Sequence, residues 1–304
     1  MKDKSDNRIP TDKRVKAYLY GDTLEMTTAI GPPGKKYIPL GNGKYRTLDG
    51  EIKEMKVSDN KGDNLSSLKK TFKRLRRLIM NNFKGGDDQL WLTLTYAENM
   101  QDVKRLVSDF RQFIKKLRRK YGQLEYISVI EPQERGAWHY HVLLKTSDGS
   151  PLYIENDDIY RKWKHGFTKT KRLSESDNVA AYVMAYLTDM DMNENDENAK
   201  SKKIVKGMRL HYYPSNMQFY RCSAGIKQPK EIDGEKNAVL INTLGQYFDI
   251  KKYRFDVNKI EPNFHGERTL KGILEDGSDL TVETEYFNID SLDLTLYERE
   301  NEED

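Results

Sequence analysis

The sequence predicts an α+β fold in which helices pack on an antiparallel sheet. Residues 64–83 and 103–121 repeat apolar residues at spacings of three and four, as amphipathic helices do. Residues 90–96 alternate in period two, and residues 124–130 and 138–145 are strand-like runs separated by a turn that contains Pro and Gly. Amphipathic helices beside an antiparallel strand pair are typical of this fold class.

Composition narrows the class of protein. The single cysteine, Cys222, excludes an intramolecular disulfide, and the lysine-rich N-terminus lacks the apolar stretch of a signal peptide. No apolar run approaches the roughly 20 residues that span a bilayer. We therefore expect a cytoplasmic protein without a membrane partner, in a chain whose 304 residues suffice for a core domain with extensions.

The charge is distributed unevenly along the chain. Residues 275–304 contain twelve Asp or Glu and one basic residue, Arg299, so the net charge of +4 for the whole chain leaves +15 for residues 1–274. A basic body of this kind indicates a polyanionic partner, and nucleic acid is the usual one. The alternative is a set of solvated charged faces and a solubilising acidic tail.

The first elements follow in order. Residues 1–60 are rich in Lys, Gly and Pro and predict a flexible start with one or two small hairpins. The helix that begins near Asn64 is apolar on one face and basic on the other, and the basic face either contacts phosphates or is simply solvated. After the strand at 90–96, the helix at 103–121 ends before Gly122, a residue type that favours C-caps.

The next elements are expected to complete a sheet. After the hairpin, residues 156–166 predict a short helix and residues 167–173 a basic strand. The resulting order β-α-β-β-α-β matches the split ferredoxin-like arrangement, an antiparallel sheet with helices on one face. Residues 174–190 predict a further helix, and local pattern alone does not order the strand-like pieces that follow.

The returning strand of the hairpin carries two of the five histidines at alternate positions. His139 and His141 therefore face one side of the sheet while Tyr140 faces the other. Glu131 ends the preceding strand, and pairing across the turn would bring its carboxylate beside the imidazoles; Glu134 could take its place. These ligands suit Mg²⁺ or Mn²⁺ when a substrate brings phosphate, with zinc as the alternative. The competing interpretation is a structural polar cluster.

Two tyrosines, Tyr182 and Tyr186, are one helical turn apart in the helix predicted for residues 174–190, so they are neighbours on one face. A phenol has a pKa near 10 and attacks phosphate only with help from a base or a metal. By itself such a pair indicates core packing. Beside a metal site it becomes a candidate pair of nucleophiles.

Three segments, "WLTLTY", "EPQERGAWHYHVLL" and "AAYVMAYLTDM", in this order and at these separations, resemble the motifs of plasmid and phage rolling-circle replication initiators in the HUH endonuclease superfamily. The strand motif matches residues 92–96, the His-hydrophobic-His motif matches residues 139–141, and the nucleophile helix matches Tyr182. The later "YRCSAGIKQP" is similar to the segment that closes the nuclease domain. The resemblance covers about residues 64–230.

The resemblance implies a divalent-metal-dependent endonuclease and strand transferase that nicks and rejoins single-stranded or hairpin origin DNA to start rolling-circle replication. Tyr182 would make the first cleavage, leaving a 5′-phosphotyrosine and a free 3′-OH, and Tyr186 would have an optional second role. Expected partners are a host helicase and polymerase, in the cytoplasm of a bacterial host of a plasmid, phage or other mobile element. Relatives usually carry a lysine three residues after the nucleophile, where this chain has Ala185.

Several residues near the predicted site would contact DNA. Basic residues follow the backbone of a single strand, and aromatic rings stack on its bases. Lys169, Lys171 or Arg172 could replace the lysine missing at Ala185. The expected set is Thr93, Thr95, Arg135, Lys169, Lys171 and Arg172, with Lys145 also near the site and Trp138 or Trp163 for stacking.

The resemblance divides the chain into a partly ordered N-terminal extension (1–63), a nicking and joining endonuclease domain (64–230) and a C-terminal extension with an acidic tail (231–304). A relaxase or a transposase with the same chemistry is one alternative, although no P-loop motif of the larger fused types is found. The other is a non-catalytic nucleic-acid-binding module on the same sheet, which would bind without metal and form no covalent adduct.

Overall fold

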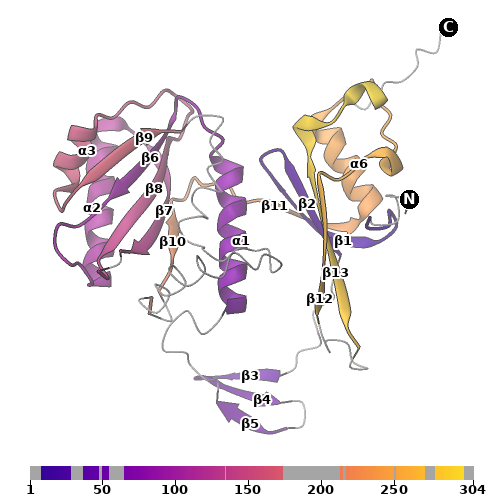
Figure 1. Cartoon of the computed structure of the whole chain (residues 1–304), viewed down its shortest axis with the longest axis horizontal. Coiled ribbons are helices and arrows are strands. Elements are labelled where there is room, and N and C mark those ends of the chain that lie inside the picture. The colour runs from indigo at the N-terminus through magenta and orange to yellow at the C-terminus, as the bar shows by residue number, and fades with distance from the viewer. Residues whose placement is uncertain are drawn as a thin grey trace, which may run out of the picture. The chain divides into compact units, whose positions relative to one another are not determined.

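The computed structural model of the protein describes nine stretches of the chain: residues 8–28, 37–47, 50–54, 65–133, 135–173, 213–214, 217–249, 251–270 and 278–297. The contacts divide the chain into two compact units (Figure 1). Residues 57–228 form one, called here the central unit. Residues 1–56 together with 229–304 form the other, called here the terminal unit.

The central unit is built on a five-stranded antiparallel sheet in the order β10-β7-β8-β6-β9 (Figure 1). Its elements are α1 (Leu65–Asn82), β6 (Gln89–Leu94), α2 (Val103–Tyr121), β7 (Leu124–Pro132), β8 (Trp138–Thr146), α3 (Asn156–Trp163), β9 (Thr168–Arg172) and β10 (Tyr220–Cys222). The path from β6 to β9 with neighbours β9-β6-β8-β7 is the split ferredoxin-like arrangement. The predicted α+β fold is confirmed, and β10 adds a fifth strand beside β7.

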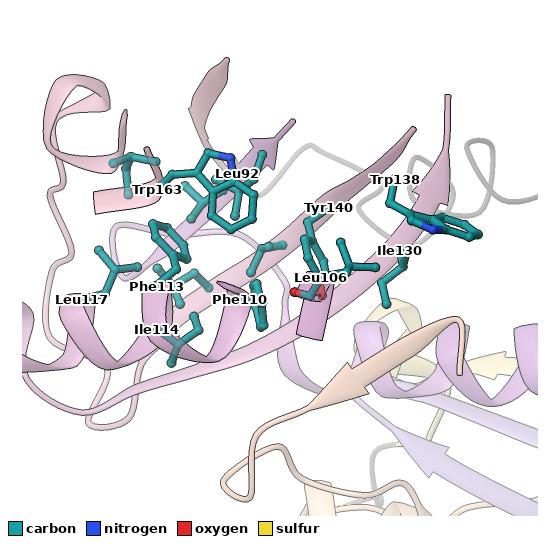
Figure 2. Close-up of a cluster of buried hydrophobic side chains, with 14 of the residues drawn as sticks. Leu92, Leu106, Phe110, Phe113, Ile114, Leu117, Ile130, Trp138, Tyr140 and Trp163 are labelled. Atoms are coloured by element: carbon teal, nitrogen blue, oxygen red, sulfur yellow. Dashed lines mark hydrogen bonds between the residues drawn. The ribbon is translucent and has the colours of Figure 1, made fainter. Parts of the chain in front are cut away.

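Helices α2 and α3 cover one face of this sheet (Figure 2). Tyr140 of β8 is fully buried there, its ring stacked on Phe110 of α2 at 4.5 Å, and its hydroxyl donates to the Leu106 carbonyl. Asp102 caps the start of α2, and Gly122 ends it with a φ of 80°, a conformation that glycine adopts without strain. The packing fixes which side chains of β8 face away from these helices.

Helix α1 packs on the opposite face, so the prediction that helices occupy one face is wrong. Leu75, Leu78 and Ile79 of α1 share a buried cluster with Ile127 of β7 and Leu143 of β8. The physical reason is that β7 and β8 carry buried apolar residues on both sides along most of their length. A sheet that is apolar on two faces needs a cover on each.

Asp158 near the start of α3 ties that helix to the end of α2. Its carboxylate accepts from the hydroxyl of Tyr121 and from the ammonium of Lys162 at 2.7 Å, and the Lys120 ammonium lies 3.2 Å away. The hydrogen bond from Lys162, together with the one from Tyr121, holds the pKa of Asp158 well below its usual range. The ionised carboxylate therefore stabilises the packing of α3.

Replacing Asp158 with Asn is expected to lower the free energy of unfolding by about 1–3 kcal/mol at pH 7, because a buried charged partner is lost. The contribution of a carboxylate with a lowered pKa is present above its unfolded-state pKa of about 3.9 and is lost as the pH falls below it. Chemical unfolding at pH 7 and at pH 3 should therefore show a gap that narrows in acid. Asp157→Asn is the matched control, since this neighbour is 68% exposed; an equal loss in both variants would contradict the assignment.

The terminal unit joins the two ends of the sequence. Its five-stranded sheet has the order β11-β1-β2-β13-β12, and β3-β4-β5 form a separate sheet of three strands (Figure 1). The elements are β1 (Arg14–Tyr20), β2 (Thr23–Thr28), β3 (Tyr37–Gly41), β4 (Lys44–Thr47), β5 (Ile52–Glu54), β11 (Lys230–Glu235), α6 (Lys236–Tyr247), β12 (Phe264–Leu270), β13 (Leu280–Asn288) and three short 3₁₀ turns at Val257–Lys259, Ile289–Ser291 and Leu294–Tyr297.

Helix α6 packs its buried Val239, Leu240 and Leu244 in one cluster with side chains of β1 and β2. The small hairpins predicted for residues 1–60 are present, but the pairing of β1 with β11 was not predicted. The boundaries proposed at residues 63 and 230 remain a prediction. None of the helices in the described ranges combines the length and apolar composition that a membrane span requires.

Candidate metal centre

The register of β7 and β8 brings the predicted ligands together. Glu131 is the cross-strand partner of His139, and Val129 is the partner of His141. Direct partners on antiparallel strands point to the same side, so the carboxylate and both imidazoles share the face away from α2 and α3. All three side chains are buried, with residue exposures of 5% for Glu131, 8% for His139 and 6% for His141.

The ligand atoms form a small triangle. The two imidazole Nε2 atoms of His139 and His141 are 3.1 Å apart, and Glu131 Oε2 lies 3.4 Å from the first and 3.1 Å from the second. Ligands about 2.1 Å from a cation are separated by about 3.0 Å at a right angle and by about 3.4 Å at a tetrahedral angle. The triangle has the size of a divalent-cation site, and the buried group could bind a metal ion.

The protonation states also suit a cation. Burial by itself would raise the pKa of Glu131, but hydrogen bonds from His139 and His141 outweigh it and lower this pKa to about 2. Burial lowers the pKa of His141, although Glu131 opposes the effect. An ionised carboxylate and a neutral imidazole near pH 7 are the forms that bind metals. Three lone pairs converge here, and one shared proton would satisfy only two of them.

The surroundings of the triangle come from β6 and β9. Thr93 pairs with His141 on one side and with Lys169 on the other, so the three residues form a row across three strands on the metal-ligand face. The Thr93 hydroxyl lies 3.5 Å from His141 Nδ1, and the Trp91 ring packs beside the His141 imidazole at 5.3 Å. Among the described residues, the buried His139 Nδ1 has no hydrogen-bond partner.

The predicted DNA-contacting residues fall into two groups. Lys169 is exposed in the row just described, and Lys171 is the partner of Trp91 on the same face. Three other side chains hold backbone carbonyls: Arg135 donates to Tyr96 and Ala97, Arg172 to Asp87 and Leu152, and Thr95 to Phe167. Lys145 likewise donates to the Asn82 carbonyl. Lys169 and Lys171 are therefore the basic residues that the fold directs toward the candidate site.

Two tryptophans expected to stack on bases are buried instead. Trp138 is 3% exposed and donates its ring N–H to the Gln101 carbonyl, and Trp163 is 1% exposed and donates to the Thr95 carbonyl (Figure 2). Their rings fill the core on the α2 side of the sheet, so the expectation that either is available for stacking is wrong. A large aromatic residue next to a charged motif gave no sign of which face it occupied.

A feature not singled out from the sequence is a hollow of about 560 Å³ at the β10 edge of the sheet. Arg74 of α1, Tyr126 of β7, and Tyr220 and Arg221 of β10 lie along it, and none of its lining residues is acidic. The basic face of α1 hinted at it, but β10 is only three residues long and its pairing with β7 is not visible in the sequence.

Tyr182, Tyr186 and Ala185 lie outside the described residues, as does Glu134. The roles predicted for them therefore stay predictions. The described part of the chain contains Glu131 in the position that Glu134 was considered to replace.

An antiparallel ferredoxin-like sheet that presents a buried pair of imidazoles and a carboxylate defines an α+β protein with a candidate metal centre. Within it, residues 89–191 match the family model of the ORF2-type replication-associated protein. The matched stretch runs from β6 past β9 and contains all three ligands, and it confirms the resemblance to replication initiators. No curated protein and no solved structure matches the chain.

Proposed function

We propose that this protein is a replication initiator that nicks and rejoins single-stranded origin DNA through a tyrosine ester, starting rolling-circle replication. The observation that carries the proposal is the grouping of Glu131, His139 and His141 inside the stretch that matches the replication-associated family. A replication role implies a nucleic-acid partner. The basic charge of residues 1–274 agrees with a polyanionic partner.

In the proposed reaction the Tyr182 phenol oxygen attacks the scissile phosphorus. An Oη–P bond forms as the P–O3′ bond breaks, the phenolic proton passes to solvent or a base, and the departing 3′ oxygen takes up a proton. The products are a 5′-phosphotyrosine and a free 3′-OH. The new ester replaces the old one, so attack by a 3′-OH reverses the step without ATP. Tyr186 is proposed as the optional second nucleophile, used when the circle is completed.

Phosphoryl transfer builds negative charge on the phosphate oxygens, and a bound Mg²⁺ or Mn²⁺ would offset that charge and polarise the phosphate. Glu131, His139 and His141 would hold the ion. The row Thr93–His141 continues to Lys169, whose ammonium is proposed to contact the phosphate backbone in place of the lysine missing at Ala185. The hollow at β10 would supply a further contact of arginine and tyrosine with the strand.

Replacing Lys169 with Ala is expected to weaken the binding of a single-stranded oligonucleotide and to slow nicking by about 10-fold or more, because one phosphate contact is lost. The salt dependence of binding should also become shallower. Fluorescence anisotropy at several salt concentrations measures both effects on binding, and a single-turnover nicking assay measures the rate. Lys104→Ala is the control, since this exposed lysine is at the start of α2; equal weakening by both variants would show a general charge effect.

Two other functions use the same residues. A relaxase or transposase would perform the same transfer on a different DNA, so a transfer-origin or transposon-end oligonucleotide is the comparison substrate. A non-catalytic nucleic-acid-binding module would use the sheet and the basic residues without bond breakage. The family match favours replication over the first alternative. The buried triad favours catalysis over the second.

Incubation of the protein with a labelled single-stranded origin oligonucleotide and Mn²⁺, followed by denaturing electrophoresis, tests the proposal. We expect a free 3′-ended product and a slower band in which the other fragment stays attached to protein, both absent after chelation. DNA that is bound but uncut under these conditions would support the non-catalytic module. Cleavage without a protein-linked fragment would support water, and not tyrosine, as the nucleophile.

A further inference from the structure

The terminal unit contains a second group of metal-ligand side chains, on the hairpin of β12 and β13. One ligand atom from each of His265, Glu267 and Glu283 lies within 4.8 Å of the other two. The register explains the grouping. Glu267 is the cross-strand partner of Glu283, and His265 lies two residues before Glu267 on the same face. The hairpin therefore brings an imidazole and two carboxylates together.

The imidazole of His265 is backed by a buried carboxylate. Its cross-strand partner is Glu285, whose Oε1 lies 3.5 Å from His265 Nδ1. Glu285 is fully buried, accepts a hydrogen bond from the Ile9 amide and pairs with the Lys236 ammonium at 2.8 Å. Metal-binding histidines usually direct their second nitrogen to a carboxylate, which orients the ring. Glu285 occupies that position behind His265.

The other ring nitrogen faces acidic groups. His265 Nε2 lies 3.6 Å from Glu267 Oε1, and within the described ranges both buried ring nitrogens lack a hydrogen-bond partner. In the same part of the chain, neither Glu267 nor Glu283 has an ion pair with Lys or Arg. Carboxylates directly opposite each other on neighbouring strands repel. A cation between them and His265 would remove the repulsion and satisfy the nitrogen lone pair.

We propose that His265, Glu267 and Glu283 bind a divalent transition-metal cation, with Glu285 as a positioning residue. One imidazole nitrogen and two carboxylate oxygens are a ligand set that Zn²⁺ and Mn²⁺ accept. Glu267 is half exposed, so the cation reaches the site from solvent. Bound there, it fastens β12, the last strand of its sheet, to β13. The site belongs to the terminal unit and does not depend on the proposed nicking activity.

Equilibrium dialysis of the full chain against Zn²⁺, and separately against Mn²⁺, counts the sites by elemental analysis. With at least one of these metals, the variant His139→Ala with His141→Ala is expected to retain one bound ion. Adding Glu267→Gln and Glu283→Gln to it should remove that ion. Both added changes keep the side-chain shape, and circular dichroism checks that the variant folds. Glu261→Gln is the matched control, an exposed glutamate before β12 whose replacement should leave the ion bound.

A thermal readout separates metal binding from a structural role. Metal should raise the melting temperature of the variant that lacks His139 and His141, and the rise should disappear when Glu267 and Glu283 are also replaced. Loss of all bound metal in the variant lacking only His139 and His141 would overturn the proposal. So would an ion that persists after Glu267 and Glu283 are replaced. Neither result depends on whether the protein nicks DNA.

Discussion

Replacing both His139 and His141 with Ala is expected to abolish metal-dependent nicking, with a rate loss of about 10³-fold or more. A metal ion supplies several kcal/mol of charge stabilisation in phosphoryl transfer, and each 1.4 kcal/mol is about a factor of ten in rate. The double variant removes two of the three ligands and leaves Glu131 alone. Single-turnover nicking of a labelled oligonucleotide at a series of Mn²⁺ concentrations measures the loss.

Two further variants make this result specific. Glu131→Gln keeps the shape of the side chain but removes the charge, so nicking should require a much higher Mn²⁺ concentration. His165→Ala removes a histidine that lies beside Asp109, outside the triad, and should retain nicking wherever the protein folds. Nicking at the normal rate and the same Mn²⁺ dependence in the double variant would show that the triad is not the metal site of the reaction.

Replacing Tyr182 with Phe is expected to remove the covalent protein–DNA product, with nicking reduced by at least about 10⁴-fold, because the attacking oxygen is gone. The variant should still bind single-stranded DNA and Mn²⁺, since the aromatic ring and the triad remain. Denaturing electrophoresis of the reaction and a binding measurement on the same preparation separate the two effects. A protein-linked fragment formed at normal yield would identify another nucleophile.

Tyr186→Phe is the natural comparison, because this tyrosine is one helical turn further along the sequence. With only an optional second role, Tyr186 should be dispensable for the first cleavage, and the variant should form the covalent product at nearly the normal rate. A defect confined to rejoining would support its use as a second nucleophile. Unchanged nicking and rejoining would leave Tyr186 as a packing residue.

The parts of the site that were predictable depend on short-range geometry. Strand periodicity alone places His139 and His141 on one face and Tyr140 on the other, and the length of the turn brings Glu131 opposite His139. The order of helices and strands from β6 to β9 was legible for a similar reason, because each element shows its own period. These features required no knowledge of distant contacts.

Other features depend on contacts between distant residues, which local patterns do not report. The pairing of β1 with β11 joins segments about 200 residues apart, and the placement of α1 follows from apolar residues on both faces of β7 and β8. Charge also misled the sequence analysis. Arg135 and Arg172 were expected at DNA, but their guanidinium groups donate to backbone carbonyls that the loops leave unpaired.

The most direct test is to locate the bond between protein and DNA. After reaction with a single-stranded origin oligonucleotide and Mn²⁺, trypsin should release residues 173–200 as one peptide, because no Lys or Arg occurs between Arg172 and Lys200. Tandem mass spectrometry is predicted to find this peptide carrying a 5′-linked nucleotide on Tyr182, only when Mn²⁺ and the triad are both present. An unmodified peptide from protein that has bound both DNA and Mn²⁺, or a nucleotide attached elsewhere in the chain, would contradict the account.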